Sequence, residues 1–305
     1  MLWLVAIGFF MQTLDATIVN TTLPAMARSF DESPLRMQSV VVAYSLTMAM
    51  LIPASGWLAD RFGTRRVYVG AISLFVLGSV ACALSQNLSQ LVAARVLQGL
   101  GGALLLPVGR LAVLRAFPRE RFLQAMSFIA IPGLVGPLIG PTLGGWLTEV
   151  ASWHWVFLIN IPVGLVGCIA TLLYMPDNPQ PVQTRFDLTG YLYLAFGMVA
   201  VSLAVDGLSG LGLRQAGVLI LLVFGLASLS AYWLHAAKRP DPLFSPRLFP
   251  IPSLSIGLLA NLFSRFGSSC MPFLVPLLLP VSPDYSPLPP RAMMVRVYAT
   301  RPLSK

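Results

Sequence analysis

Two charged residues lie in otherwise apolar sequence and could exchange a proton. Asp15 follows Leu14 near the N-terminus, and Arg95 opens the segment 95–102. A charge inside an apolar helix is costly and therefore usually has a function and a partner. A carboxylate beside an arginine stays ionised, whereas in an apolar site without that partner it takes up a proton. The alternatives are an arginine that extends to the membrane interface and an acid with only a structural hydrogen-bonding role.

The composition indicates the kind of element that must position these residues. The 305 residues are 56% hydrophobic and 10% charged, and the mean hydropathy is +0.78. Soluble domains carry about 25% charged residues, so a soluble enzyme, a disordered protein and a disulfide scaffold are excluded. We predict an all-α polytopic membrane protein with about nine transmembrane helices. The apolar stretches run roughly over 2–23, 38–59, 67–85, 90–110, 123–148, 154–175, 189–208, 215–235 and 253–279.

The distribution of positive charge predicts the orientation of these helices. The net charge is +9, which in a soluble protein would suggest a nucleic-acid partner. Basic residues concentrate in the loops that are cytoplasmic when the N-terminus is cytoplasmic, as membrane proteins prefer. Those residues are Arg61, Arg65, Arg66, Arg110, Arg115, Arg119, Arg121, Arg185, Lys238, Arg239 and Arg247. We therefore expect a multi-pass protein of the cell (inner) membrane that binds no nucleic acid.

The helix rise gives the depth of the two charged residues. Asp15 lies about 20 Å above the inner end of the first span, and Arg95 about 8 Å below the outer end of the fourth. In a hydrocarbon core of about 30 Å these depths nearly coincide. We expect the two side chains to face one cavity and to interact electrostatically. Gln12 and Thr22, at helical spacing from Asp15, and Gln98 would extend a polar lining for substrate.

The segment 56–66 between the second and third spans has a regular spacing of glycine, acid and base. Its candidate residues are Gly56, Asp60, Arg61, Gly63, Arg65 and Arg66. We expect the glycines to form a tight turn, the acid to cap the next helix and the arginines to remain in the cytoplasm. An ordinary charged loop is the alternative.

The fifth span is dense in glycine and proline, a composition that neighbouring helices can support in a membrane. Its candidate residues are Gly136, Gly140, Pro141, Gly144 and Gly145. Close helix packing alone would also explain them. The segment 141–149 resembles 53–60, which predicts two inverted three-helix repeats, a common transporter arrangement; chance similarity is the alternative.

Together these segments resemble the major facilitator superfamily. The segment 56–66 resembles its signature loop, 95–102 the fourth-span motif of proton-coupled members, and 136–147 the antiporter motif, although Ser127 replaces an upstream glycine. The segments 14–24 and 153–162 are similar to the fourteen-span drug:proton antiporter branch. The resemblance implies proton-coupled multidrug efflux by alternating access. The proton gradient would be the energy source, no cofactor would be needed, and small hydrophobic or cationic drug-like molecules would be the substrates.

The resemblance also implies a domain organisation. Residues 1–175 would form a six-helix transporter domain, 176–252 a linker region with two extra spans, and 253–279 the first span of a second domain. Residues 280–305 are rich in proline and arginine, and we expect an interrupted reading frame near residue 280 and a truncated product. A non-transporting remnant or assembly module and an uptake carrier are the alternatives. No metal-binding or enzymatic constellation is visible, and the oligomeric state is not readable.

Overall fold

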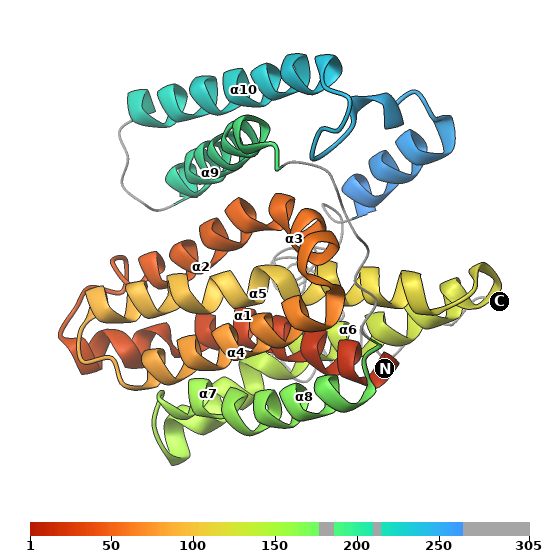
Figure 1. Ribbon diagram of the computed structural model, residues 1–305. Helices are drawn as coiled ribbons and strands as arrows, with labels where there is room; N and C mark the ends of the chain where they lie inside the picture. Colours follow the sequence, from red (N-terminus) through yellow and green to blue (C-terminus); the bar gives the residue numbers. More distant parts are fainter. Residues whose placement is uncertain (177–185, 210–214, 265–305) are drawn as a thin grey trace, which may run out of the picture. The chain divides into compact units, whose positions relative to one another are not determined.

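The computed structural model describes residues 1–176, 186–209 and 215–264, and regular structure in this part of the chain is helical (Figure 1). The chain divides into the units Met1–Ser245 and Pro246–Lys305. The first unit contains α1 (Leu2–Phe30), α2 (Gln38–Leu51), η1 (Ile52–Ala54), α3 (Ser55–Phe62), α4 (Thr64–Ala83), α5 (Leu88–Ala116), α6 (Arg119–Val150), α7 (Trp155–Leu158), α8 (Asn160–Tyr174), α9 (Leu188–Ser209) and α10 (Gln215–Lys238). The second contains η2 (Pro246–Leu248) and the helix Pro252–Ser264.

Eight segments of the described chain are long and apolar enough to cross a membrane. They are Leu2–Phe30, Gln38–Phe62, Thr64–Ala83, Leu88–Ala116, Arg119–Val150, Trp155–Tyr174, Leu188–Gly207 and Gln215–Lys238. They coincide with the first eight predicted spans, and the all-α class is confirmed. The ninth prediction, 253–279, begins with the short apolar helix Pro252–Ser264; its remainder lies outside the described residues.

Local signals explain where these helices begin, end and break. The side chain of Asn87 accepts a hydrogen bond from the Gln90 amide at 2.9 Å and so caps the N-terminus of α5. Asp31 ends α1 in the left-handed conformation, with φ 53°. Pro53 lies in η1, where the second span changes from α2 to α3, because proline lacks the amide hydrogen that an α-helix needs.

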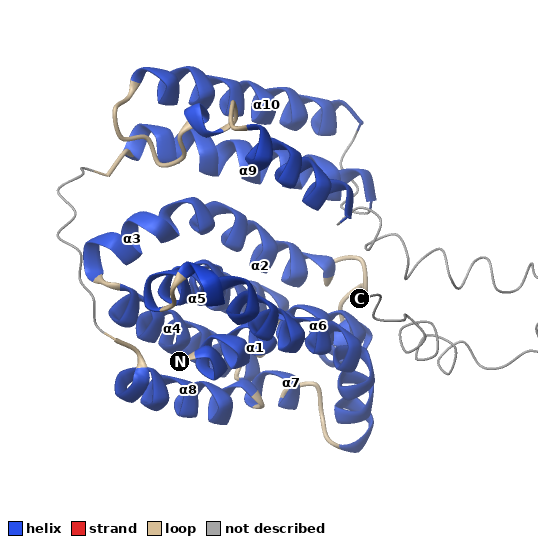
Figure 2. Cartoon of the chain, turned by 90° about the vertical axis from the view of Figure 1, so that its right-hand side faces the viewer, coloured by secondary structure: helices blue, strands red, loops and turns tan. Residues whose placement is uncertain are grey.

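The first six spans pack around a buried centre. α1 packs along α6 and contacts α5 and α8, while α4 packs against both α5 and α8. Figure 2 shows α5 next to both α4 and α1 within this group. One apolar cluster includes Met11 and Leu104, and another includes Ile18 and Leu91. Along α1, Asp15 therefore lies between these two apolar clusters. Along α5, Arg95 likewise lies between them.

Candidate functional site

Asp15 and Arg95 form a buried ion pair between α1 and α5. Arg95 Nη1 donates to Asp15 Oδ2 at 2.6 Å, and the two side chains are 0–1% exposed. Arg95 Nε also donates to the Val40 carbonyl at 3.4 Å, and the guanidinium lies 4.1 Å from the centre of the Tyr44 ring. The expected electrostatic interaction is confirmed, and an arginine extended to the interface is excluded. Because the pair is buried, it does not face an open cavity in this conformation.

Three further polar side chains complete the surroundings of this carboxylate. Gln98 Nε2 and Asn160 Nδ2 donate to Asp15 Oδ1 at 2.8 and 3.0 Å. Both amides also donate to Ser79 Oγ, at 2.9 and 3.3 Å. Gln98 Oε1 accepts from Arg95 Nη1 at 2.6 Å. The five side chains therefore form one network that joins α1, α4, α5 and α8.

This network provides the ionised carboxylate of Asp15 with an opposite charge and with hydrogen-bond donors. Two unpaired charges would be very costly in an apolar interior, but here the carboxylate has an opposite charge and three nitrogen donors. Ser79 and Asn160 were not among the residues predicted from the sequence to form the site. Asn160 does belong to the segment 153–162 that carried part of the family resemblance, which was the available signal.

The other two residues predicted to line a substrate site are buried. Gln12 Nε2 donates weakly to Met48 Sδ at 3.9 Å, while its Oε1 has no hydrogen-bond partner among the described residues. Thr22 donates to the Val19 carbonyl of its own helix at 2.9 Å. In this conformation Thr22 thus faces protein, and contact of either residue with substrate stays a prediction.

The loop at 56–66 differs from its prediction at two positions. Gly63, with φ 86°, makes the turn between α3 and α4, as expected. Gly56 instead lies inside α3 with open space around it, so its predicted turn role is wrong. The predicted cap by Asp60 is also wrong, because Gly63 precedes α4 without a side-chain cap, and Asp60 pairs with Arg115 at the end of α5. The acid therefore joins two helices rather than ending one.

The arginines of this loop have two different environments. Arg61 and Arg66 are exposed. Arg65 donates to the Leu172 carbonyl in the last turn of α8. Carbonyls in the last turn lack a partner within their own helix, and basic side chains commonly bind them. Arg65 thus connects the loop to α8.

The glycines of the fifth span form a close contact between α6 and α1. A Cβ atom at Gly136, Gly140 or Gly144 would overlap the hydroxyl of Thr13, Thr17 or Thr21, respectively. These glycines recur every four residues and therefore occupy one face of the helix. Gly145 has open space and Pro141 is exposed, so neither takes part in this contact. The close-packing interpretation is confirmed for three of the four glycines.

The histidine of the loop between α6 and α7 stacks on a neighbouring ring. The ring of His154 lies 3.7 Å from that of Trp153, centre to centre, and partial burial lowers the pKa of His154 below its ordinary value. The imidazole is therefore neutral at pH 7. Trp155 is exposed, as expected of an interfacial aromatic residue, but Trp153 is buried.

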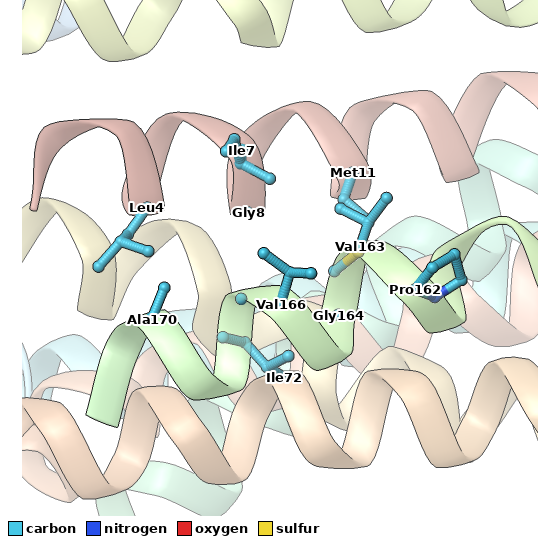
Figure 3. Close-up of a pocket in the computed structure, with 11 residues that line it drawn as sticks. Leu4, Ile7, Gly8, Met11, Ile72, Pro162, Val163, Gly164, Val166 and Ala170 are labelled. Atoms are coloured by element: carbon cyan, nitrogen blue, oxygen red, sulfur yellow. The ribbon is translucent and has the colours of Figure 1, made fainter. Parts of the chain in front are cut away.

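A separate apolar groove lies between α1, α4 and α8 (Figure 3). Its volume is about 390 Å³, and its lining includes Leu4, Ile7 and Met11 of α1 and Val163 and Val166 of α8. Figure 3 shows these side chains directed toward the space between the two helices. The described residues that line it include no charged side chain, so the groove is chemically unlike the network around Asp15.

Comparison with known protein families decides the identity of this helical unit. Residues 5–188, which include the whole Asp15 network, match the family described as Major Facilitator Superfamily. The chain belongs to the major facilitator superfamily. It is accordingly a multi-pass membrane protein, and the resemblance seen in its sequence motifs is confirmed.

Several curated members of the superfamily are similar over almost the entire chain. The MdtD proteins of Serratia proteamaculans, Pectobacterium carotovorum and Yersinia enterocolitica, named for multidrug resistance, are 54%, 52% and 51% identical to it over 294 residues. Each alignment covers 96% of this chain and 61–63% of the relative. The chain thus spans less than two thirds of the length of these relatives.

Solved structures support the fold of the superfamily. Crystal structures of the peptide transporter POT and of a POT family transporter give TM-scores of 0.56 and 0.58 at 18% identity. The matches cover 78–79% of this chain and 52–53% of those chains. At this identity the likeness concerns the fold alone.

Proposed function

We propose that this chain takes part in proton-coupled export of small hydrophobic or cationic drug-like molecules by alternating access. The observation that carries the proposal is the buried pair of Asp15 and Arg95, one acid and one base that are 0–1% exposed in the centre of six spans. A buried carboxylate can change its proton affinity greatly when its partner moves. The names of the MdtD relatives support the substrate class.

Coupling follows from the two states of the pair. With Arg95 in place, the Asp15 carboxylate is ionised and joins α5 to α1. When Arg95 moves away during a conformational change, the isolated carboxylate takes up a proton from the aqueous side to which the site is then open. Return of the guanidinium releases that proton. If the two states open the site to opposite sides of the membrane, each cycle carries a proton inward while substrate moves outward.

Two other properties belong to this proposal. The proton gradient supplies the energy, so no cofactor is required. The concentration of arginine and lysine in alternate loops supports a cytoplasmic N-terminus in the inner membrane. The predicted division into residues 1–175, 176–252, 253–279 and 280–305, with two inverted repeats, stays a prediction.

Dye transport into everted membrane vesicles, whose cytoplasmic face points outward, tests the function. The 305-residue chain is expressed in a pump-deficient bacterium, and substrate movement is measured under an imposed pH gradient. Asp15→Asn should abolish gradient-driven transport while the amount of inserted protein is unchanged. Glu149→Gln, which neutralises an exposed acid at the end of α6, is the matched control and should transport normally.

Each outcome of this assay has a definite meaning. Undiminished proton-coupled transport by Asp15→Asn would overturn the role of Asp15. An inserted wild-type chain that moves no dye would favour a non-transporting membrane module. Gradient-driven movement in the opposite direction would identify an uptake carrier.

A further inference from the structure

Ser79 and Asn160 make hydrogen bonds at the proposed proton site in addition to the ion pair between Asp15 and Arg95. We propose that Asn160, supported by Ser79, is a positioning residue that holds the Asp15 carboxylate in its ionised form and orients it toward Arg95. This inference rests on the proposed function, because it concerns the acid that exchanges the proton. Neither residue belonged to the predicted site.

Each oxygen of the Asp15 carboxylate accepts hydrogen bonds from nitrogen donors. Asp15 Oδ2 accepts from Arg95 Nη1 at 2.6 Å, while Oδ1 accepts from Gln98 and Asn160 at 2.8 and 3.0 Å. Hydrogen bonds donated to a carboxylate favour its charged form. Since Gln98 and Arg95 both belong to α5, Asn160 supplies the donor that comes from a different helix.

Ser79 orients the side-chain amides of both Gln98 and Asn160. Its hydroxyl donates to the Phe75 carbonyl at 2.9 Å, so its lone pairs are available to the Gln98 and Asn160 nitrogens. A side-chain amide nitrogen carries two hydrogens. In each amide one hydrogen is therefore directed to Asp15 and the other to Ser79. This arrangement leaves the nitrogen, and not the carbonyl oxygen, facing the carboxylate.

The two amides differ in how they could respond when Asp15 is protonated. A neutral acid has an O–H group that needs an acceptor. Gln98 Oε1 is already used by Arg95 Nη1 and by the thiol of Cys82, so a reversed Gln98 amide would deprive the guanidinium of a partner. Asn160, in contrast, makes its hydrogen bonds to Asp15 and Ser79 through its Nδ2. A half-turn of that amide would present its carbonyl to the new O–H group without moving the helix.

Within the part of the chain that the structure describes, few other titratable groups surround Asp15. Arg95 approaches Asp15 from α5. The Tyr44 hydroxyl of α2 and the Cys82 thiol of α4 also interact electrostatically with Asp15. From α6 the nearby positions are glycines, and from α8 the contact is Asn160. Asn160 is therefore a neutral group whose removal changes the surroundings of the acid without changing the charge of the site.

The test is an infrared titration of the complete chain in lipid nanodiscs. The C=O stretch of protonated Asp15 is assigned by its loss in Asp15→Asn, and its intensity is followed against pH. Loss of one hydrogen bond to a charged group should move the midpoint of Asn160→Leu to higher pH by about one unit. Ser79→Ala should move it in the same direction by less, and Asn160→Gln, which retains the amide, should restore part of the wild-type midpoint.

Thr171→Val is the matched control, because Thr171 is a buried polar residue of α8 that donates to the Gly167 carbonyl of its own helix. It should leave the midpoint unchanged. Equal midpoints for Asn160→Leu and Thr171→Val would overturn the inference, and if Asn160→Leu does not fold, an unshifted Ser79→Ala would do the same. The titration needs no transport, so a shifted midpoint together with normal efflux by Asp15→Asn would reject the proposed function but not the positioning role.

Discussion

Replacement of Arg95 by methionine isolates the contribution of the buried charge pair. Methionine has a similar length and an apolar end, so Arg95→Met removes the charge while filling most of the space. Asp15 then retains only the two amide donors, from Gln98 and Asn160, in a site that is 0–1% exposed. We expect the folded state to lose stability because a buried carboxylate is left without its counter-charge.

The size of the effect follows from burial. Removing one partner of a buried ion pair costs about 3–5 kcal/mol, because the remaining charge is uncompensated. The two amide donors reduce this penalty, so we expect about 3 kcal/mol for Arg95→Met. Asp15→Asn combined with Arg95→Met removes both charges, and such a replacement is often close to neutral. The double variant should therefore be more stable than Arg95→Met alone, with a coupling energy of about 3 kcal/mol or more.

Equilibrium unfolding of the complete chain in mixed micelles measures these free energies. Arg61→Met, at an exposed position of the 56–66 loop, is the control for loss of an arginine. The penalty of Arg95→Met should be smaller at acidic pH, because the isolated carboxylate can then take up a proton. The reasoning is refuted if Arg95→Met costs no more than Arg61→Met, or if the two single substitutions add without coupling.

Two further predictions concern helix packing. Gly140→Leu should destabilise the α1–α6 contact by about 1–3 kcal/mol, because its Cβ would overlap Thr17. Gly145→Leu should be nearly neutral, because there is open space at that position. The same unfolding assay compares the two variants. His235→Ala should weaken the packing of α9 against α10 by about 1 kcal/mol, because His235 Nε2 lies 3.0 and 3.1 Å from the two carboxylate oxygens of Asp187. Hydrogen exchange should become faster in these two helices alone. Unchanged exchange would contradict the prediction.

The loop at 56–66 shows how far a local pattern can be interpreted. The positive φ of Gly63 was predictable, because a residue without a side chain adopts that conformation readily. The partner of Asp60 was not predictable, because Arg115 lies 55 residues further along the chain. A capping role and a long-range ion pair use the same carboxylate, and the sequence spacing does not distinguish them.

The sequence alone determined the membrane class, the first eight spans and the family. A backbone in hydrocarbon must satisfy its hydrogen bonds within each segment, so apolar length by itself specifies a helix. Helix rise also placed Asp15 and Arg95 at one depth. Only the tertiary structure decided that Ser79 and Asn160 join them, because Asn160 is 145 residues from Asp15. Which faces of four helices meet depends on packing between helices, such as the glycine contact of α6 with α1, and that packing is not encoded in the periodicity of any single helix.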